Sequence, residues 1–310
     1  MNVLVIKLGA LGDFVYALGP MAAIRRAHAG DHITLLTTKP FARLGKECGY
    51  FDDVWVDEKP KAFDVLGWLR LRSRLNRGQF SIVYDLQNND RTSFYLRLFS
   101  PRPEWVGAAK GASHRNTNPA RVLGHAFHGH VQTLALAGIT DVALDPLAWM
   151  RCEVAVFGLP SSYVLLVAGS SPQHPEKRWP IEYYRVLAAK LLRQGYHPVL
   201  IGSSAEEEAN AAIARGLDVL NLTGKTALED LPALARGAEA AIGNDTGPMH
   251  IICVTGCPTV MFFCSQKSTI QKHGPQGPRV LALEADDISK ITPEDAMAAF
   301  FKVLPKKEGA

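Results

Sequence analysis

The sequence predicts an α/β protein built from two successive domains, each formed around a parallel β-sheet. Short apolar, β-branched runs alternate with longer amphipathic segments along the chain, which is typical of strands joined by helical crossovers. This alternation is interrupted once, at 146–160, and then starts again. A length of 310 residues also favours two domains, because a domain averages roughly 150 residues.

The first half of the chain opens with the run NVLVIK at 2–7, whose nearly continuous apolar character predicts a strand buried on both faces. The other strands predicted in this half are 32–37, 53–56, 81–85 and 104–107. The predicted helices are 14–27, 63–77, 92–99 and 122–137. Between them, the small and polar segment 108–120 is predicted to form an exposed loop.

The second half repeats the pattern from the apolar run at 163–168 onward. The further strands predicted here are 197–201, 219–222, 240–243, 259–263 and 280–283. The predicted helices are 181–194, 205–215, 228–236, 247–255 and 293–304. The last helix begins with a proline, which is favoured at that position, and we expect residues 306–310 to be frayed.

Composition excludes several classes of protein. Apolar residues make up 47% and charged residues 21%, as in ordinary soluble domains, and no apolar run is long enough for a transmembrane helix. The first apolar run is short and has no basic residues before it, so it is not predicted to be a secretory signal. Five cysteines are too few and too scattered for a disulfide scaffold, which favours a reducing cytoplasm. A net charge of +4 is too small for a dedicated DNA-binding protein but suits an anionic substrate or membrane surface.

The first motif is KLGALGD at 7–13, where a strand ends and a helix begins. Its glycines, Gly9 and Gly12, allow close approach of a ligand to the backbone, and a helix N-terminus favours negative charge. A dinucleotide site would need a third glycine and an acidic residue after the second strand, where this chain has 37–39 as Thr-Thr-Lys. Asp13 has two interpretations: a carboxylate that satisfies helix amides, or a general base facing a cleft.

The second motif, 168–180, again links a strand to a helix. Backbone amides, the hydroxyls of Ser170 and Ser171, and the adjacent cations Lys177 and Arg178 are suited to a diphosphate. The alternative is a solvated loop whose tryptophan packs into the core.

The third motif, 243–250, has the same strand-to-helix position. The amides near Thr246 and Gly247 indicate a phosphate site at a helix N-terminus, although Asp245 could instead cap that helix. His250 falls within the helix, where a lone histidine is more often a packed core residue than a catalyst.

Three weaker features remain. Glu206 follows a strand and could accept from ribose hydroxyls, or it could belong to an exposed acidic helix start. The cysteines near 253–264 lack metal-site spacing and are predicted to be core residues. A group of cations could face a phosphorylated acceptor or a membrane, or could form a solvated helix face. These cations are Lys59, Lys61, Arg70, Arg72, Arg74 and Arg77.

Taken together and in this order, the motifs resemble glycosyltransferase family 9, the ADP-heptose:lipopolysaccharide heptosyltransferases. The resemblance spans nearly the whole chain. The matching segments are Lys7…Gly12-Asp13…Pro20, Asp85-Leu86-Gln87, Gly169…Lys177-Arg178-Trp179-Pro180, Thr223-Gly224-Lys225-Thr226 and Asp245-Thr246-Gly247-Pro248-Met249-His250.

The resemblance implies a GT-B fold, in which two Rossmann-like domains with parallel sheets face a central cleft. Residues 1–155 would then form an acceptor-binding domain and 156–290 a nucleotide-sugar-binding domain. Residues 291–310 would form a C-terminal helix that packs back on the N-terminal domain. The family inverts the anomeric centre and needs no metal for the chemistry.

Carried over, Asp13 would be the general base on the acceptor hydroxyl. Lys177, with the two serines, would hold the donor diphosphate, and Asp245 would contact the donor sugar. The donor-binding set implied by the resemblance is Ser170, Ser171, Lys177, Glu206, Asp245, Thr246, Gly247 and His250. The acceptor-binding set, with weaker support, is Gly12, Lys59, Lys61 and Arg91.

The function expected from this resemblance is inverting transfer of heptose from ADP-heptose to a hydroxyl of a lipopolysaccharide core. The ADP-sugar would be a substrate, and no cofactor or metal is expected. The partners would be the donor and a lipid-linked glycan, without nucleic acid. We expect a cytoplasmic protein in peripheral contact with the inner face of the cytoplasmic membrane. The alternatives are a GT-B relative with another nucleotide sugar or acceptor, an epimerase, and a non-catalytic nucleotide-sugar-binding paralogue.

Overall fold

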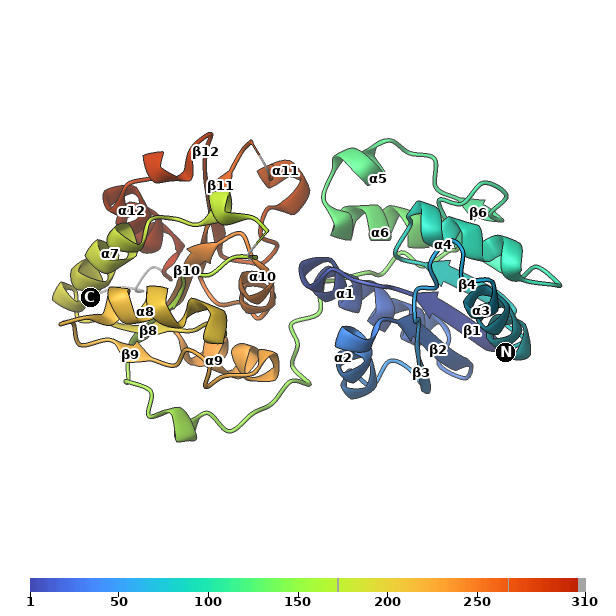
Figure 1. Ribbon diagram of the computed structural model, residues 1–310, viewed down its shortest axis with the longest axis horizontal. Coiled ribbons are helices and arrows are strands. Elements are labelled where there is room, and N and C mark those ends of the chain that lie inside the picture. Colours follow the sequence, from blue (N-terminus) through green and yellow to red (C-terminus); the bar gives the residue numbers. More distant parts are fainter. Residues whose placement is uncertain (172, 267, 306–310) are drawn as a thin grey trace. The chain divides into compact units, whose positions relative to one another are not determined.

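A computed structural model describes residues 1–171, 173–266 and 268–305 (Figure 1). The chain forms two compact units, Met1–Asp145 and Pro146–Ala310, each built around a six-stranded parallel sheet. The units divide ten residues before the boundary expected at 155, so the irregular segment that begins at Pro146 belongs to the second unit. The predicted α/β class with two parallel sheets is confirmed.

The first unit has the strand order β3-β2-β1-β4-β5-β6. Its strands are β1 (Asn2–Ile6), β2 (His32–Thr37), β3 (Asp53–Val56), β4 (Ile82–Asp85), β5 (Glu104–Gly107) and β6 (His114–Arg115). All neighbours pair in parallel, for example Val3 with Ile33 on one side and with Ile82 on the other. The short strand β6 lies inside the segment predicted to be a loop, because a two-residue pairing at a sheet edge leaves almost no apolar pattern.

The helices of the first unit cover its sheet. They are α1 (Leu11–Ala27), α2 (Ala42–Glu47), α3 (Val65–Arg77), α4 (Asp90–Tyr95), α5 (Ala120–Leu123) and α6 (Ala126–Ala135), with 3-10 turns η1 (Lys39–Phe41) and η2 (Leu96–Leu98). On one side, the inward residues Leu71 and Leu75 of α3 join Leu4 and Ile6 of β1 in a buried cluster. This cluster also contains the fully buried Trp105.

The second unit repeats the topology, with the order β12-β11-β10-β7-β8-β9. Its strands are β7 (Tyr163–Val167), β8 (His197–Leu200), β9 (Leu220–Asn221), β10 (Ala240–Asn244), β11 (Thr259–Cys264) and β12 (Val280–Ala285). The order reverses between β7 and β10, as it does between β1 and β4 in the first unit. In such sheets, ligands bind beyond the carboxyl ends of the strands at this reversal.

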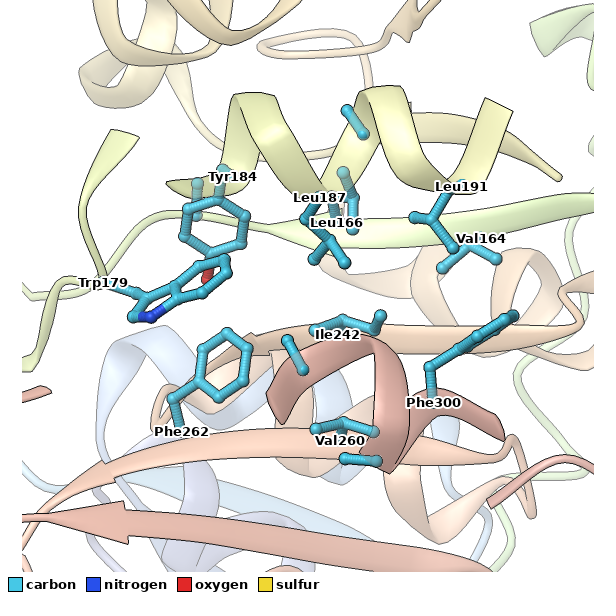
Figure 2. Packing of buried hydrophobic residues seen from close by; sticks show 14 of the residues in the cluster. Val164, Leu166, Trp179, Tyr184, Leu187, Leu191, Ile242, Val260, Phe262 and Phe300 are labelled. Carbon is cyan, nitrogen blue, oxygen red and sulfur yellow. The ribbon is translucent and has the colours of Figure 1, made fainter. Parts of the chain in front are cut away.

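The helices of the second unit are α7 (Ile181–Arg193), α8 (Glu207–Ala214), α9 (Leu231–Gly237), α10 (Gly247–Val254), α11 (Ile270–His273) and α12 (Pro293–Val303). Five 3-10 turns accompany them: η3 (Ala155–Phe157), η4 (Pro175–Lys177), η5 (Ser204–Glu206), η6 (Leu228–Asp230) and η7 (Ile288–Lys290). Figure 2 shows the core between the sheet and α7, where Trp179, Tyr184 and Phe262 pack together. Trp179 is therefore a core residue, as we expected if the segment 168–180 were a loop whose tryptophan packs into the core.

Helix α12 belongs to the second unit. The inward side chains of α12, Ala296, Ala299 and Phe300, are buried in the core of the second unit. That residues 291–310 pack back on the N-terminal domain stays an expectation. The helix contacts α7 and strands β10–β12. Its apolar face therefore completes the core of its own unit. Residues 306–310 of the expected segment lie outside the described residues.

Candidate functional site

A pocket of about 350 Å³ lies in the second unit, at the carboxyl ends of its central strands. It forms where β7 and β10 are neighbours, which is the position that the topology predicts for a ligand. The loops after β7, β8 and β10 contribute its polar wall, and the segment 226–231 contributes apolar residues. The lining residues include Gly169, Ser170, Ser171, Gly202, Ser203, Glu206, Leu228, Leu231, Thr246 and Pro248.

Asn244, the last residue of β10, holds two of these loops in place. Its side chain is fully buried, and its Nδ2 donates to the carbonyl of Ala168 at 2.7 Å. Its Oδ1 accepts from the backbone amide of Trp179 at 3.1 Å and from the Tyr184 hydroxyl at 3.0 Å. Removing a buried, fully bonded amide leaves its partners unsatisfied. Asn244 is therefore a positioning residue, a role that the motif at 243–250 did not predict.

Beside this amide, Asp245 joins two cations into a charged chain. Lys177 Nζ lies 2.6 Å from Asp245 Oδ2, and His250 Nε2 lies 3.3 Å from Asp245 Oδ1. The side chain of Asp245 is only 5% exposed. Burial alone would raise the pKa of this carboxyl, but His250 and Lys177 outweigh it and hold the pKa well below its usual range.

The same pairing acts on His250. Burial disfavours its charged form, but the hydrogen bond to Asp245, with a smaller contribution from Cys253, raises the pKa of His250 to about 9. A buried imidazolium therefore faces a buried carboxylate. His250 is more than a packed core residue, and Asp245 does not serve as the cap of α10.

The two serines of the second motif, Ser170 and Ser171, differ in burial and in hydrogen bonding. Ser170 is buried; its hydroxyl donates to the carbonyl of His174 at 3.0 Å and accepts from Arg178 Nε at 3.2 Å. Ser171 is exposed and accepts from the amide of Gln173 at 3.4 Å. Arg178 thus fixes the shape of the loop, while Ser171 faces outward along the pocket wall.

Glu206 takes part in a capping box and also lines the pocket. Its Oε2 accepts from the amide of Ser203 at 2.8 Å and from the Ser203 hydroxyl at 2.7 Å, forming a capping box. The same side chain lines the pocket and packs against two glycines. A Cβ at Gly169 would lie 2.8 Å from Glu206 Cγ, and one at Gly202 would lie 3.2 Å from Glu206 Cβ. A side chain at 169 would therefore displace Glu206 from this position.

Helix α10 begins at Gly247, and its N-cap Thr246 accepts no side-chain hydrogen bond from the helix. Thr246 and Pro248 line the pocket, whereas Gly247 is absent from its wall. The first turn of α10 therefore points its positive end toward the pocket region. Of the predicted donor residues, Ser170, Ser171, Glu206 and Thr246 line the pocket. Lys177, Asp245 and His250 form the charged chain next to Thr246.

In the first unit, Asp13 lies in the first turn of α1 and is half-buried. Its carboxylate forms no hydrogen bond or ion pair within the described residues, so the structure does not support the capping interpretation. The loop before it turns at Gly9, whose φ of +126° favours glycine, and a Cβ there would lie 2.7 Å from the Phe41 ring.

Two buried ionisable residues, Lys7 and Asp85, lie at the ends of β1 and β4 next to this loop. Lys7 Nζ donates to the carbonyl of Leu86 at 3.3 Å, and Asp85 accepts from the amides of Gln87 and Asn88 at 3.0 and 2.8 Å. Burial raises the pKa of Asp85 to about 6 and lowers that of Lys7, whereas the charges of Asp13 and Asp85 act on Lys7 in the opposite direction.

A second pocket, of about 530 Å³, lies in the first unit beside this loop. It is lined by Leu8, Gly9, Ala10, Thr38, Pro40, Phe41, Lys59, Gln87, Asn89 and Arg91. Two of the four residues predicted to bind an acceptor, Lys59 and Arg91, are brought together here. Gly12 and Lys61 do not line this pocket: Gly12 lies within α1, and Lys61 is exposed in the loop before α3.

Two features are absent from the described residues, which omit 172, 267 and 306–310. Within them, no group of three or more histidine, cysteine or acidic side chains is arranged to hold a metal ion. Likewise, none of the helices in the described ranges has the length and apolar character that crossing a bilayer requires.

Two units with Rossmann-like strand order, joined by one irregular connection, define the GT-B class of α/β proteins. The chain belongs to glycosyltransferase family 9 (heptosyltransferase), whose sequence pattern matches residues 68–292.

Individual relatives agree with this assignment. Lipopolysaccharide heptosyltransferase 2 of Salmonella typhimurium is 36% identical over 218 residues, which is 63% of this chain and 62% of the relative. The match thus spans about three fifths of the length of that protein. Lipopolysaccharide heptosyltransferase 1 of Pseudomonas aeruginosa is 23% identical over 294 residues, covering 85% of this chain and 78% of the relative.

Solved structures show the same fold. A family 9 glycosyl transferase from Veillonella parvula superimposes with a TM-score of 0.81 at 23% identity, covering 97% of this chain and 96% of that one. The E. coli heptosyltransferase WaaC with ADP has a TM-score of 0.73 at 18% identity, covering 98% of this chain and 100% of that one.

Proposed function

We propose that this protein is an inverting glycosyltransferase that moves heptose from ADP-heptose to a hydroxyl of a lipopolysaccharide core. The observation that carries the proposal is the pocket at the β7–β10 reversal, with helix α10 and the Lys177–Asp245–His250 chain beside it. Membership of family 9 supports it, as do relatives that are lipopolysaccharide heptosyltransferases and a structure of similar fold that holds ADP.

The donor would bind in the second unit. The amides at the start of α10 and the cation of Lys177 suit a diphosphate, because both favour negative charge. Glu206 would accept from ribose hydroxyls through Oε1, since Oε2 is engaged by Ser203. As the sugar leaves, charge grows on the departing phosphate, and fixed amides and Lys177 would stabilise that charge.

The acceptor hydroxyl would be activated by Asp13. A carboxylate can take the hydroxyl proton as the oxygen attacks the anomeric carbon. Attack on the face opposite the leaving ADP inverts that centre. In this proposal the chain needs neither a metal nor a cofactor, since the leaving group is stabilised by protein groups alone.

The acceptor would bind in the first unit, where Lys59 and Arg91 line the second pocket. The two cations suit an acidic or phosphorylated sugar. Because the proposed acceptor is carried on a lipid, the protein would work in peripheral contact with the cytoplasmic face of the membrane.

The test begins with calorimetry against ADP, UDP, GDP and NAD in parallel. The proposal expects selective binding of ADP. ADP-heptose is then incubated with heptose-deficient core acceptors, and the mass of the acceptor is measured. Gain of one heptose with release of ADP supports the proposal. Preference for UDP or GDP would overturn the donor, and ADP binding with no transfer to any acceptor would favour a non-catalytic role.

A further inference from the structure

The first unit carries an exposed apolar surface around the start of α3. Its members are Phe63, Val65, Leu66, Leu69 and Phe94, and we call this set the α3 surface. Phe63 is 96% exposed, and the other four are between 41% and 66% exposed. Single exposed apolar residues are ordinary, but three on one helix, with others on adjoining segments, indicate an interaction site.

Helix α3 has apolar residues on two different faces. Leu71 and Leu75 point inward and are buried in the core. Val65, Leu66 and Leu69 lie on the opposite side of the helix and are exposed. No other element of the unit packs over them in the described residues. The outward apolar residues are therefore unnecessary for the fold of this unit.

The turn that carries Phe63 is held in place. Asp64 Oδ1 accepts from the amide of Gly67 at 2.8 Å and caps α3, and Trp68 Nε1 donates to the carbonyl of Lys61 at 3.0 Å. Phe94 packs edge-on against Trp68, with ring centroids 5.2 Å apart. The α3 surface is thus presented by fixed backbone.

Exposed cations flank this surface. Lys59 and Lys61 precede it, and Arg70, Arg72 and Arg77 follow it on α3. Carboxylates near these cations include three in the segment 57–64. Asp57 is buried and accepts from the Tyr95 hydroxyl at 2.6 Å, Asp64 caps the helix, and Glu58 is exposed.

The α3 surface is continuous with the pocket of the first unit. The Arg91 guanidinium lies 5.4 Å from the centroid of the Trp68 ring, and its Nη2 donates to the carbonyl of Pro60 at 3.2 Å. Arg91 and Lys59 also line the pocket. A partner that covers the α3 surface would therefore lie beside the pocket opening.

We propose that the α3 surface docks on the surface of an anionic lipid bilayer. Apolar side chains flanked by lysine and arginine match the boundary between acyl chains and anionic headgroups, where each part meets its complement. Phe63, Val65, Leu66 and Leu69 enter this boundary, and the cations contact lipid phosphates. This docking proposal rests on the proposed function. It would place the acceptor pocket beside the lipid that carries the acceptor.

The test is sedimentation with vesicles of phosphatidylcholine alone and of phosphatidylcholine mixed equally with phosphatidylglycerol. The full chain is expected to bind the anionic vesicles and to be released by salt. The double variant Phe63→Glu, Leu66→Glu is expected to lose at least roughly tenfold in partition. Arg70→Gln and Arg72→Gln are each expected to lose roughly fivefold on the anionic vesicles.

Val156→Glu is the matched control, because Val156 is 76% exposed but belongs to the second unit. It is expected to bind like the unaltered chain. Thermal unfolding checks that all variants fold. Equal vesicle binding by the double variant, or no binding by the unaltered chain, would overturn the proposal. So would a concentration-dependent dimer that the double variant abolishes, because the occupant would then be a second copy.

The outcome is separable from that of the proposed function. Vesicle binding needs neither donor nor acceptor, and ADP binding by the double variant is measured without vesicles. A protein that binds ADP but no vesicles would refute only the docking proposal. A protein that binds vesicles through α3 but no nucleotide would refute only the proposed activity.

Discussion

Lys177 and Asp245 form a partly buried ion pair, with Nζ 2.6 Å from Oδ2, that links the loop after β7 to the loop after β10. The pair brings a cation to the start of α10 while His250 binds the other carboxylate oxygen. An incoming diphosphate would compete with, or share, the cation that Asp245 holds. The pair therefore keeps Lys177 oriented at the place where we propose that negative charge develops.

Replacing Lys177 should weaken donor binding. Lys177→Ala is expected to lower ADP affinity about ten- to hundredfold, because a hydrogen bond to a charged group contributes about 1.5–3 kcal/mol. Isothermal calorimetry with ADP measures the change. Lys190→Ala is the control, since Lys190 pairs with Glu294 on the α7–α12 side of the unit. Unchanged ADP affinity in Lys177→Ala would remove this lysine from the donor site.

Glu206 should distinguish the nucleoside part of the donor from its phosphates. Glu206→Ala is expected to reduce ADP affinity about tenfold and to leave pyrophosphate affinity unchanged, because the carboxylate is proposed to accept from ribose hydroxyls. The neighbouring exposed Glu207→Ala serves as the control. If both ligands weaken equally, the effect comes from loss of the capping box with Ser203 and not from a ribose contact.

The pairing of His250 with Asp245 should make stability depend on pH on the alkaline side. The pKa of His250 is raised from an ordinary value of 6.5 to about 9, so its contribution is fully present below about pH 6.5 and is lost as the pH rises through 9. We expect the unaltered chain to lose about 1–3 kcal/mol of unfolding free energy between about pH 6 and about pH 10 from this group.

His250→Gln isolates that contribution. Urea unfolding at the two pH values should show a smaller loss in the variant than in the unaltered chain. Other titrating groups cancel in this comparison, because they are present in both proteins. Identical pH slopes would mean that the ion pair contributes nothing to folding.

Much of the fold was predictable because buried parallel strands leave a strong local signal. The runs at 2–7 and 163–168 are nearly continuous in apolar residues, and β1 and β7 lie within them. The polar residues that follow such strands must gather at the carboxyl edge of the sheet. This pattern indicated phosphate contacts after β7 and β10, where Ser170 and Thr246 lie, and the resemblance to family 9 added Glu206 to the same site.

The remainder depended on contacts between distant residues. The two-residue strand β6 has no periodicity to read, and the place of α12 was decided by which core its apolar face completes. Asn244 resembles any polar residue at a strand end, and its role depends on partners more than 60 positions away. Gly12 and Lys61 were chosen by their nearness in sequence to the loop and cations, and that nearness did not place them in the pocket.

Asp13 decides whether the proposed chemistry is correct. Asp13→Asn preserves the size and polarity of the side chain in the first turn of α1 but removes its ability to accept a proton. A general base contributes at least roughly a hundredfold, so we expect turnover with ADP-heptose and a core acceptor to fall by that factor or more. ADP affinity should be unchanged, because the donor pocket lies in the second unit.

Asp31→Asn provides a control carboxylate in the first unit, where Asp31 binds His28 and the N-terminus. Turnover near that of the unaltered chain in Asp13→Asn would mean that another group takes the proton, whereas a parallel loss of ADP binding would mean that the substitution has disturbed more than α1.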